Sequence, residues 1–353
     1  MMAPEERARL LLETAENPAF SRALTKISET SGIAPTSVAE LYALWRGTIA
    51  PDTVSHWLTA MGLGAGAEGP PLFPVGQVAI VAPGNLFVAT WTAMLEPWLC
   101  GNHVRVRASS GDAHGAHALA DAIGHEALEV RSFPRDDNDG WRWLAADANA
   151  MAVYGGDDAV AAVTKIAANV GFRGAVRGHG HKVSVARLTA AQIRAKASEV
   201  GHDAWLADGR GCMSLRAVVC PDVERFSAAD ADALVALGQR WPRGELSLQT
   251  LGARRQFIEH ARVVEGLDGA MRVYESDDTA VVVDETHRSN IQLSDLGPGG
   301  RLLVVLRDGV IGPDLRGFLA SDVAGLGDIG KLQAPVIWRD PDGYRVGRVF
   351  LRH

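Results

Sequence analysis

The chain has 353 residues, of which 47% are hydrophobic and 22% are charged, and its formal net charge is −7. This composition, with a mean hydropathy of +0.02 and a pI of about 5.9, describes a globular protein and excludes a disordered chain. The acidic balance gives no basic face for nucleic acid. A chain of this length favours two α/β domains, or one large one.

The three cysteines, Cys100, Cys212 and Cys220, show no Cys-x-x-Cys spacing, and the histidines are scattered. A disulfide framework and a metal site are therefore not expected. The charged N-terminus lacks a signal-peptide core, and no run approaches the roughly 20 apolar residues of a membrane span. The sequence thus predicts a soluble, cytoplasmic protein with no membrane partner.

The N-terminal region has a helical pattern. Residues 4 to about 68 carry apolar residues at three-to-four spacing, and Ser37 with Glu40 predicts a capping box. The glycine- and proline-rich segment from Gly62 to Pro71 predicts a linker. We expect residues 1–70 to form a helical region that packs on the next domain.

Strands and helices alternate after the linker. The predicted strands are 77–81, 103–107, 128–130 and 150–154, and the predicted helices are 86–99, 113–123 and 157–170. This order predicts βαβ units, right-handed crossovers and a mostly parallel sheet. Ligands of such sheets bind beyond the carboxyl ends of the strands, so we expect the chemistry there.

Two strand ends carry candidate site residues. The segment Ala82-Pro83-Gly84-Asn85 follows the first strand and puts the Asn85 amide beside backbone N–H groups at a helix start. Gly155-Gly156 follows the fourth strand and offers bare backbone for a pyrophosphate. The alternatives are an N-cap role for Asn85 and a simple turn for the glycines. No Gly-x-Gly-x-x-Gly motif follows the first strand, which disfavours an ordinary Rossmann dehydrogenase.

A glycine-rich segment from Ala207 to Arg216 precedes the apolar run Ala217–Cys220 and raises Cys212 on a turn. Such a turn presents a thiol to a cleft while the following strand anchors it. We interpret Cys212 as a nucleophile. The alternative is a small buried hydrophobe, because free cysteine is usually buried.

The remaining segments predict a second α/β layer around this cysteine. The predicted helices are 189–206, 228–241 and 248–262, and the predicted strands are 215–220, 270–274, 279–283 and 302–306. A Pro-Asp-Gly turn within 340–343 predicts a closing β-hairpin from Pro335 to Leu351.

Several motifs in order resemble the aldehyde dehydrogenase superfamily. Residues 73–85 read FPVGQVAIVAPGN, and residues 99–110 read LCGNHVRVRASS. These match the PVG-strand-PxN and GN-x-V-x-x-K-x-S segments of that superfamily. Gly180–Ser184 and Gly211-Cys212 fall at its GGKSP-like segment and its nucleophilic cysteine.

The closer resemblance is to the LuxC-type acyl-CoA reductases, the fatty-acyl reductases of bacterial bioluminescence. This chain has counterparts of five of their motifs: the GN start, the YGG turn, the G-x-K-V-S strand, the G-C-x-S motif and the G-x-x-Q-x-P tail. The tail lies at Gly330–Trp338 and is followed by Asp342-Gly343. The resemblance runs from about residue 73 to the C-terminus. It implies an aldehyde-dehydrogenase-like α/β fold: a Rossmann-type parallel-sheet cofactor domain at 71–182 and an α/β catalytic domain at 183–330. It also implies a C-terminal hairpin at 331–353, which returns to the cofactor domain or forms an oligomerisation arm.

The resemblance also implies a mechanism. A Cys212 thiolate attacks an acyl thioester, carried on CoA or on an acyl carrier protein, and releases the carrier thiol. Hydride from a nicotinamide then gives an aldehyde. The Asn85 amide and the Cys212 backbone N–H are the implied oxyanion donors, and one such donor is worth about 3 kcal/mol.

The implied cofactor site draws on three loops. Its residues are Pro83, Arg107, Ser109, Ser110, Gly155 and Gly156. Arg107 replaces the usual lysine, and Ser110 replaces the acidic residue that suits the 2′-hydroxyl of NAD. An arginine without a carboxylate favours a 2′-phosphate, so we expect NADPH, with NADH as the alternative.

Some positions depart from the superfamily pattern. Oxidising members keep a glutamate, the general base for water, four residues before the lysine of the GGK segment, and this place is Gly178. The absence of this base favours a reductase over an oxidase. The glutamate that holds the nicotinamide ribose is not recognisable, and Glu285 is a poor candidate for it.

Charged and titratable side chains near the motifs carry alternatives. His179 and His181 are acid or base candidates near the thiol, with a packed or surface role as the alternative. The pair Asp157-Asp158 opposes a pyrophosphate, and its alternative is a helix cap.

Two other functions stay open. One is a CoA-acylating or ordinary aldehyde dehydrogenase, and the other is a degenerate member that binds a nucleotide or a partner without turnover. The closing hairpin allows a homo-oligomer, with a monomer as the alternative.

Overall fold

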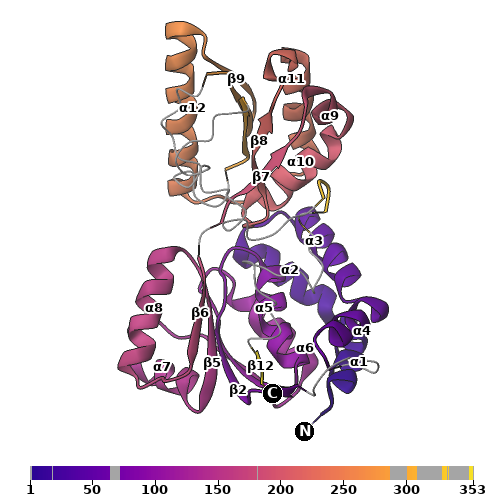
Figure 1. The fold of residues 1–353 in the computed structure, drawn as a ribbon, viewed down its shortest axis with the longest axis vertical. Helices are drawn as coiled ribbons and strands as arrows, with labels where there is room; N and C mark the ends of the chain where they lie inside the picture. The colour runs from indigo at the N-terminus through magenta and orange to yellow at the C-terminus, as the bar shows by residue number, and fades with distance from the viewer. Residues whose placement is uncertain are drawn as a thin grey trace. The chain divides into compact units, whose positions relative to one another are not determined.

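The computed structural model describes residues 2–17, 19–63, 72–180, 182–286, 300–307, 328–331, 333 and 350–352. The chain divides into two compact units, coloured along the chain in Figure 1. Unit 1 comprises Met1–Ser31, Leu41–His181 and Ala334–His353, and unit 2 comprises Gly32–Glu40 and Lys182–Gln333.

Unit 1 is built on a five-stranded sheet in the order β4-β3-β2-β5-β6, in which every neighbouring pair is parallel. Its strands are β2 (Gln77–Val81), β3 (His103–Arg107), β4 (Leu128–Arg131), β5 (Ala148–Tyr154) and β6 (Ala175–His179). A parallel sheet needs cover on both faces, which explains why β2 and β5 are almost continuously buried and apolar.

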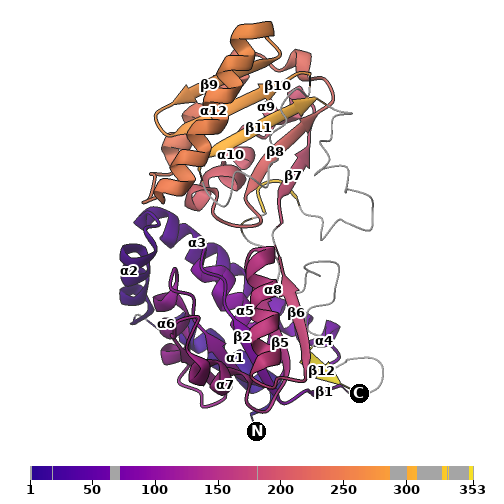
Figure 2. The same cartoon turned by 90° about the vertical axis from the view of Figure 1, so that its left-hand side faces the viewer.

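Helices cover both faces of this sheet, as Figures 1 and 2 show. Helices α5 (Phe87–Leu99) and α6 (Ala113–Ile123) lie on one face, and α7 (Asn138–Ala145) and α8 (Asp157–Asn169) lie on the other. The first pair connects β2 to β3 to β4, and the second pair flanks β5. The connections therefore run in opposite directions from β2, as in a doubly wound sheet.

The N-terminal helices are α1 (Pro4–Ala15), α2 (Ala19–Ser31), α3 (Pro35–Thr48) and α4 (Pro51–Ala60). An aromatic cluster joins α2 and the unit 1 part of α3 to α5. Trp91 of α5 lies at its centre, and its ring centroid is 4.7 Å from that of Trp45 and 5.1 Å from that of Phe20. Buried aromatic pairs at these separations add to the apolar burial that fixes the helices. The short strands β1 (Phe73–Pro74) and β12 (Leu351–Arg352) pair antiparallel in the same unit.

Unit 2 has its own five-stranded sheet in the order β7-β8-β11-β10-β9. Its strands are β7 (Ser184–Arg187), β8 (Leu215–Cys220), β9 (Met271–Ser276), β10 (Thr279–Asp284) and β11 (Leu302–Arg307). Only the edge strand β9 runs antiparallel, because it joins β10 by a tight hairpin. Strand β8 is buried along its whole length, so the cysteine turn that precedes it is anchored in the core.

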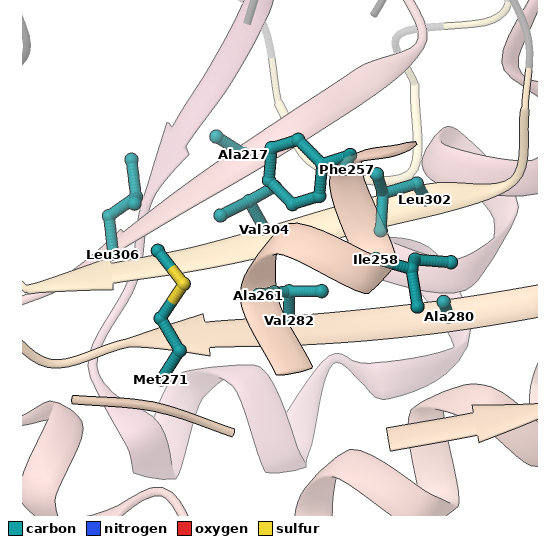
Figure 3. Close-up of a cluster of buried hydrophobic side chains, with 10 residues drawn as sticks. All are labelled: Ala217, Phe257, Ile258, Ala261, Met271, Ala280, Val282, Leu302, Val304 and Leu306. Carbon is teal, nitrogen blue, oxygen red and sulfur yellow. The ribbon is translucent and has the colours of Figure 1, made fainter. Parts of the chain in front are cut away.

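The helices of unit 2 again lie on both faces of the sheet. They are α9 (Ala190–Ala195), α10 (Ala197–Trp205), α11 (Ala228–Leu237) and α12 (Leu248–Asp268). Figure 3 shows Phe257, Ile258 and Ala261 of α12 packed over β8, β10 and β11. This apolar cluster is the core of one face of unit 2.

The structure corrects several predicted elements. The helix expected over 189–206 is broken at Lys196 into α9 and α10, and α12 continues six residues past the expected end at 262, to Asp268. The capping box of Ser37 with Glu40 is wrong, because α3 already begins at Pro35. Glu40 instead accepts a hydrogen bond from Trp241 Nε1 at 3.0 Å.

Residues 335–349, which make up most of the predicted closing hairpin, lie outside the described residues, as does His181. Among the described residues, none of the helices combines the length and apolar character needed to cross a membrane.

Candidate functional site

Three of the sequence-predicted loops meet at the carboxyl edge of the unit 1 sheet. Pro83–Asn85 follows β2, Arg107–Ser110 follows β3 and Gly155–Gly156 follows β5. Because β2 lies between β3 and β5 and all three are parallel, their last residues lie at one edge. This is also the point where the connections change direction, the usual ligand position of such sheets.

The loops after β2 and β3 are interlocked. A Cβ built on Gly111 would lie only 2.5 Å from the carbonyl oxygen of Gly84, and one built on Gly84 would overlap Ser109 Oγ. A side chain at Gly111 would overlap the backbone of Gly84, so glycine is required there, whereas at Gly84 the close contact is with the Ser109 side chain.

Asn85 lies one residue before the N-cap residue of α5, which is Leu86, with φ −145° and ψ 126°. The alternative N-cap role for Asn85 is therefore wrong. Its half-buried amide is on the loop itself, where the resemblance expects an oxyanion donor.

Arg107 ends β3, and its guanidinium lies over two rings, 5.2 Å from the centroid of Phe133 and 5.1 Å from that of Trp141. Burial, followed by the nearby cation Arg135, lowers the pKa of Arg107, yet an arginine stays charged near neutral pH. Its buried Nε has no hydrogen-bond partner within the described ranges. The charged guanidinium, at the carboxyl end of β3, is a candidate contact for an anionic group such as a nucleotide phosphate.

Gly156 is the N-cap residue of α8, and no described atom lies within 4 Å of the place where its Cβ would be. A phosphate fits such an open, bare helix N-terminus. Asp157 and Asp158, however, occupy the first turn of α8 rather than its cap, and they stabilise the helix through its dipole. The alternative cap role is wrong, and their charges oppose an anion at this end.

Cys212 lies in unit 2, on the turn between the 3₁₀ helix η1 (Leu206–Gly209) and β8, and it is exposed. The alternative of a buried hydrophobe is therefore wrong for Cys212, although it holds for Cys100 and Cys220. The turn closes on itself: the Ser214 amide donates to Gly211 O at 3.0 Å, and the Gly211 amide donates to Ser214 Oγ at 3.1 Å. Ser184 Oγ donates to Cys212 O at 2.9 Å and ties the turn to β7.

The backbone before Cys212 is strained. Ala207, Asp208 and Gly209 all have left-handed φ values, of 53°, 58° and 67°. Two consecutive non-glycine residues in this region are costly, and such strain is concentrated at functional sites. Arg216 stabilises this conformation, since its Nη2 donates to Gly209 O at 2.7 Å.

A distant segment of unit 2 supports the same turn, and sequence reasoning did not assign it this role. Gln333 is buried, and its Nε2 donates to Asp203 O at 3.0 Å and to Ser214 Oγ at 3.4 Å. The fully buried Asp203 also accepts from the Gly330 amide at 2.6 Å. The sequence identifies Gln333 only as part of the G-x-x-Q motif, because no local pattern indicates its contact with Ser214.

The other sequence candidates are accounted for by local packing. The His179 ring stacks on Tyr154 at 4.3 Å, and Glu285 accepts a hydrogen bond from Arg272. Gly178 lies in β6 with Val160 directly over it. No group of metal-binding side chains occurs among the residues that the structure describes.

The two doubly covered sheets, with candidate loops at one and an exposed cysteine turn at the other, define the aldehyde dehydrogenase fold. A methylmalonate-semialdehyde dehydrogenase from Oceanimonas doudoroffii matches with a TM-score of 0.68 at 15% identity, over 99% of this chain and 85% of that one. An NAD-dependent benzaldehyde dehydrogenase from Corynebacterium glutamicum matches with a TM-score of 0.65 at 16% identity, over 87% of this chain and 72% of that one. A succinic semialdehyde dehydrogenase from Streptococcus pyogenes, in complex with NADP⁺, matches with a TM-score of 0.64 at 12% identity, over 92% and 75%.

Within this superfamily, the profile of the acyl-CoA reductase (LuxC) family matches residues 71–302. The chain belongs to that family, and it is an oxidoreductase of acyl or aldehyde groups. No curated protein matches the sequence.

Proposed function

We propose that the protein is an NADPH-dependent reductase that converts an acyl thioester, carried on CoA or on a carrier protein, into an aldehyde. The observation that carries this proposal is the exposed Cys212 on a turn that buried polar contacts hold in a strained conformation. A nucleophile needs both access and fixed geometry, and this turn offers both.

In the first step the Cys212 thiolate attacks the thioester carbonyl, and the new C–S bond forms as the carbonyl π electrons move to oxygen. The Asn85 amide and the Cys212 backbone N–H stabilise the resulting oxyanion. The oxyanion re-forms the carbonyl as the carrier thiolate leaves and takes a proton, and Cys212 remains acylated.

A bound NADPH would supply the hydride for the second step. Arg107, Ser109 and Ser110 would hold the adenine ribose and its 2′-phosphate, while Pro83 and the backbone of Gly155 and Gly156 would line the rest of the cofactor path. The same two donors stabilise the second oxyanion at Cys212, which collapses to the aldehyde and returns the thiolate.

The acyl group leaves Cys212 by reduction because the position of the base that activates water in oxidising relatives is a glycine in this chain. Gly178, in β6, carries no side chain where oxidising relatives keep a glutamate. An acyl-enzyme that resists hydrolysis is available for hydride transfer.

Mass spectrometry of the protein after mixing with acyl-CoA tests the proposal. We expect one acyl adduct on Cys212, and we expect Cys212→Ala to abolish both the adduct and NADPH consumption. Cys220→Ala is the matched control: Cys220 is buried, and burial is the main reason that its pKa rises to about 12, so its thiol is unreactive. Acylation at another residue, or unchanged turnover of Cys212→Ala, contradicts the proposal.

A second candidate is a member that binds a nucleotide without turnover, favoured by Asp157 and Asp158 in the first turn of α8. NADPH fluorescence separates the two functions. Binding without any acyl adduct on Cys212 supports the second candidate.

A further inference from the structure

Asp112 is a buried carboxyl group that the proposed reaction does not use. It directly precedes α6 and is 4% exposed. Its Oδ2 lies 2.8 Å from Thr90 Oγ1 of α5. The same Thr90 oxygen lies 3.0 Å from the carbonyl oxygen of Pro83, in the loop that carries Asn85.

If Asp112 is ionised, the oxygens Asp112 Oδ2, Thr90 Oγ1 and Pro83 O have only one hydrogen among them, that of the Thr90 hydroxyl. A threonine hydroxyl has one hydrogen, and a carboxylate and a carbonyl oxygen have none, so only one of the two short separations is then a full hydrogen bond. If Asp112 is protonated, its O–H donates to Thr90 Oγ1 and the Thr90 hydrogen is left for Pro83 O. Both separations are then ordinary O–H···O hydrogen bonds.

The surroundings of Asp112 favour its uncharged form. Burial raises its pKa to about 7, against smaller lowering effects of the Thr90 hydroxyl and the Gly115 backbone. A Cβ on Gly115 would lie 2.9 Å from the carboxyl carbon of Asp112, so the absence of a side chain there makes room for the group.

Among the described residues, no cation compensates the carboxylate. None of the charged or titratable residues on α5, α6 and the elements packed on α6 is among the groups that shift the pKa of Asp112. They are Glu5, Glu6, Arg7, Arg9 and Glu13 of α1, Arg22, Lys26 and Glu29 of α2, Glu96 of α5, His114, His117 and Asp121 of α6, and Glu129 and Arg131 of β4. Arg107, on the strand before this loop, is engaged by Phe133 and Trp141.

The hydrogen-bond chain joins two loops that are already in contact. Gly84 and Gly111 touch through their backbones, and Trp91 Nε1 of α5 donates to Gly115 O at 2.6 Å. The position of Pro83 relative to α6 therefore depends on the bonds that Thr90 can make.

We propose that Asp112 is a positioning residue which, as an uncharged carboxylic acid, holds the Pro83–Asn85 loop through the Thr90 hydroxyl. The hydrogen bonds from Asp112 through Thr90 to Pro83 hold this loop in a fixed position relative to Ser109 and Ser110. The inference rests on the proposed function in one respect, the assignment of these loops to the nucleotide and the oxyanion.

Nucleotide affinity as a function of pH provides the first test, with NADPH fluorescence as the readout. We expect the affinity of the wild-type protein to fall by about tenfold between pH 6 and pH 8.5, the equivalent of one lost hydrogen bond. Asp112→Asn keeps an N–H donor toward Thr90 at every pH, so its affinity should match the wild type at pH 6 and persist at pH 8.5. Thr90→Val removes the chain and should bind weakly at both values.

Urea unfolding without nucleotide provides a second test that does not depend on the proposed function. The native carboxyl retains a proton that the unfolded chain releases, so wild-type stability should fall as pH rises toward about 7. Asp112→Asn, which keeps a residue suited to the N-cap position, should lose this part of the pH dependence.

Equal pH dependence of the wild type and Asp112→Asn in unfolding overturns the proposal, as does an Asp112→Asn variant that binds NADPH as weakly as Thr90→Val at pH 6. A wild-type protein that binds no nucleotide at any pH contradicts the proposed function alone. The unfolding series then decides the role of Asp112.

Discussion

At the scale of one residue, Gly178 of β6 is closely covered by Val160 of α8. A Cβ built there would overlap Val160 Cγ1 and lie 3.5 Å from Val160 Cβ. The β-branched Val160 has little rotamer freedom in α8, so it cannot easily move aside. Any side chain at this position, and not only a carboxylate, therefore requires Val160 to move.

Gly178→Ala should destabilise the protein by about 1–3 kcal/mol, the usual cost of overpacking. Val160→Ala in the same chain should relieve most of this loss, because it removes the atoms that the new methyl group meets. Urea unfolding of the two single variants and the double variant measures the coupling.

Gly47→Ala is the matched control for that series. Gly47 lies within α3, and no described atom is within 4 Å of its ideal Cβ. Its replacement should stabilise the protein by up to about 1 kcal/mol, since alanine is the better helix former. A Gly178→Ala variant as stable as Gly47→Ala would contradict the steric account.

At the scale of elements, the cysteine turn depends on segments that are far apart in the sequence. Gln333 and Ser214 are 119 residues apart, yet their side chains are hydrogen-bonded in the interior of unit 2. Ser214 is fully buried and accepts from both Gln333 and the Gly211 amide. Its hydroxyl connects the tail segment to the turn that presents Cys212.

Ser214→Ala should reduce stability by about 1–3 kcal/mol, because two buried donors lose their acceptor. The acylation of Cys212 by acyl-CoA should also slow, since the turn loses a bond that fixes its geometry. Stopped-flow release of the carrier thiol and urea unfolding measure the two effects.

Ser198→Ala serves as the control for this variant. Ser198 is exposed, and in the described part of the chain its hydroxyl accepts a surface hydrogen bond from Arg240 Nη1. We expect stability and acylation within error of the wild type. If Ser214→Ala behaves in the same way, the tail does not support the turn.

Local patterns predicted those elements whose ends carry strong signals. Strands β2, β3 and β8 and helix α6 have the predicted bounds, because apolar runs with charged or glycine ends mark them. Helix α7 was missed: its N-cap Asp137 lies in a run of aspartates and asparagine that favours a turn. The order of strands, the Gln333 contact and the Asp112–Thr90 pair were not predictable, since each depends on residues brought together only by the folded sheet.

At the scale of the whole molecule, the residues proposed for the cofactor and for the acyl group belong to different units. The proposed cofactor residues Pro83, Arg107, Ser109, Ser110, Gly155 and Gly156 belong to unit 1, whereas Cys212 belongs to unit 2. Each unit has its own sheet and its own apolar core. We therefore expect the units to respond separately to a nucleotide and to core mutations.

A nucleotide should stabilise unit 1 selectively. At about 100 times its Kd, NADPH should add about 2.7 kcal/mol to the unfolding free energy of that unit. If Arg107 holds the 2′-phosphate, NADPH should stabilise more than NADH at equal concentration, and Arg107→Ala should remove the difference. Calorimetry with each nucleotide measures the shift, and Arg142→Ala, an exposed arginine on α7, is the control.

In the same calorimetric experiment, Phe257→Ala identifies which thermal unfolding transition belongs to unit 2. Phe257 is 3% exposed in the cluster between α12 and the unit 2 sheet, so its truncation should cost that unit about 3–5 kcal/mol. The transition that Phe257→Ala lowers should be the one that NADPH leaves unchanged. If NADPH instead shifts the transition that Phe257→Ala lowers, the assignment of the cofactor loops to unit 1 is wrong, because a ligand stabilises the unit to which it binds.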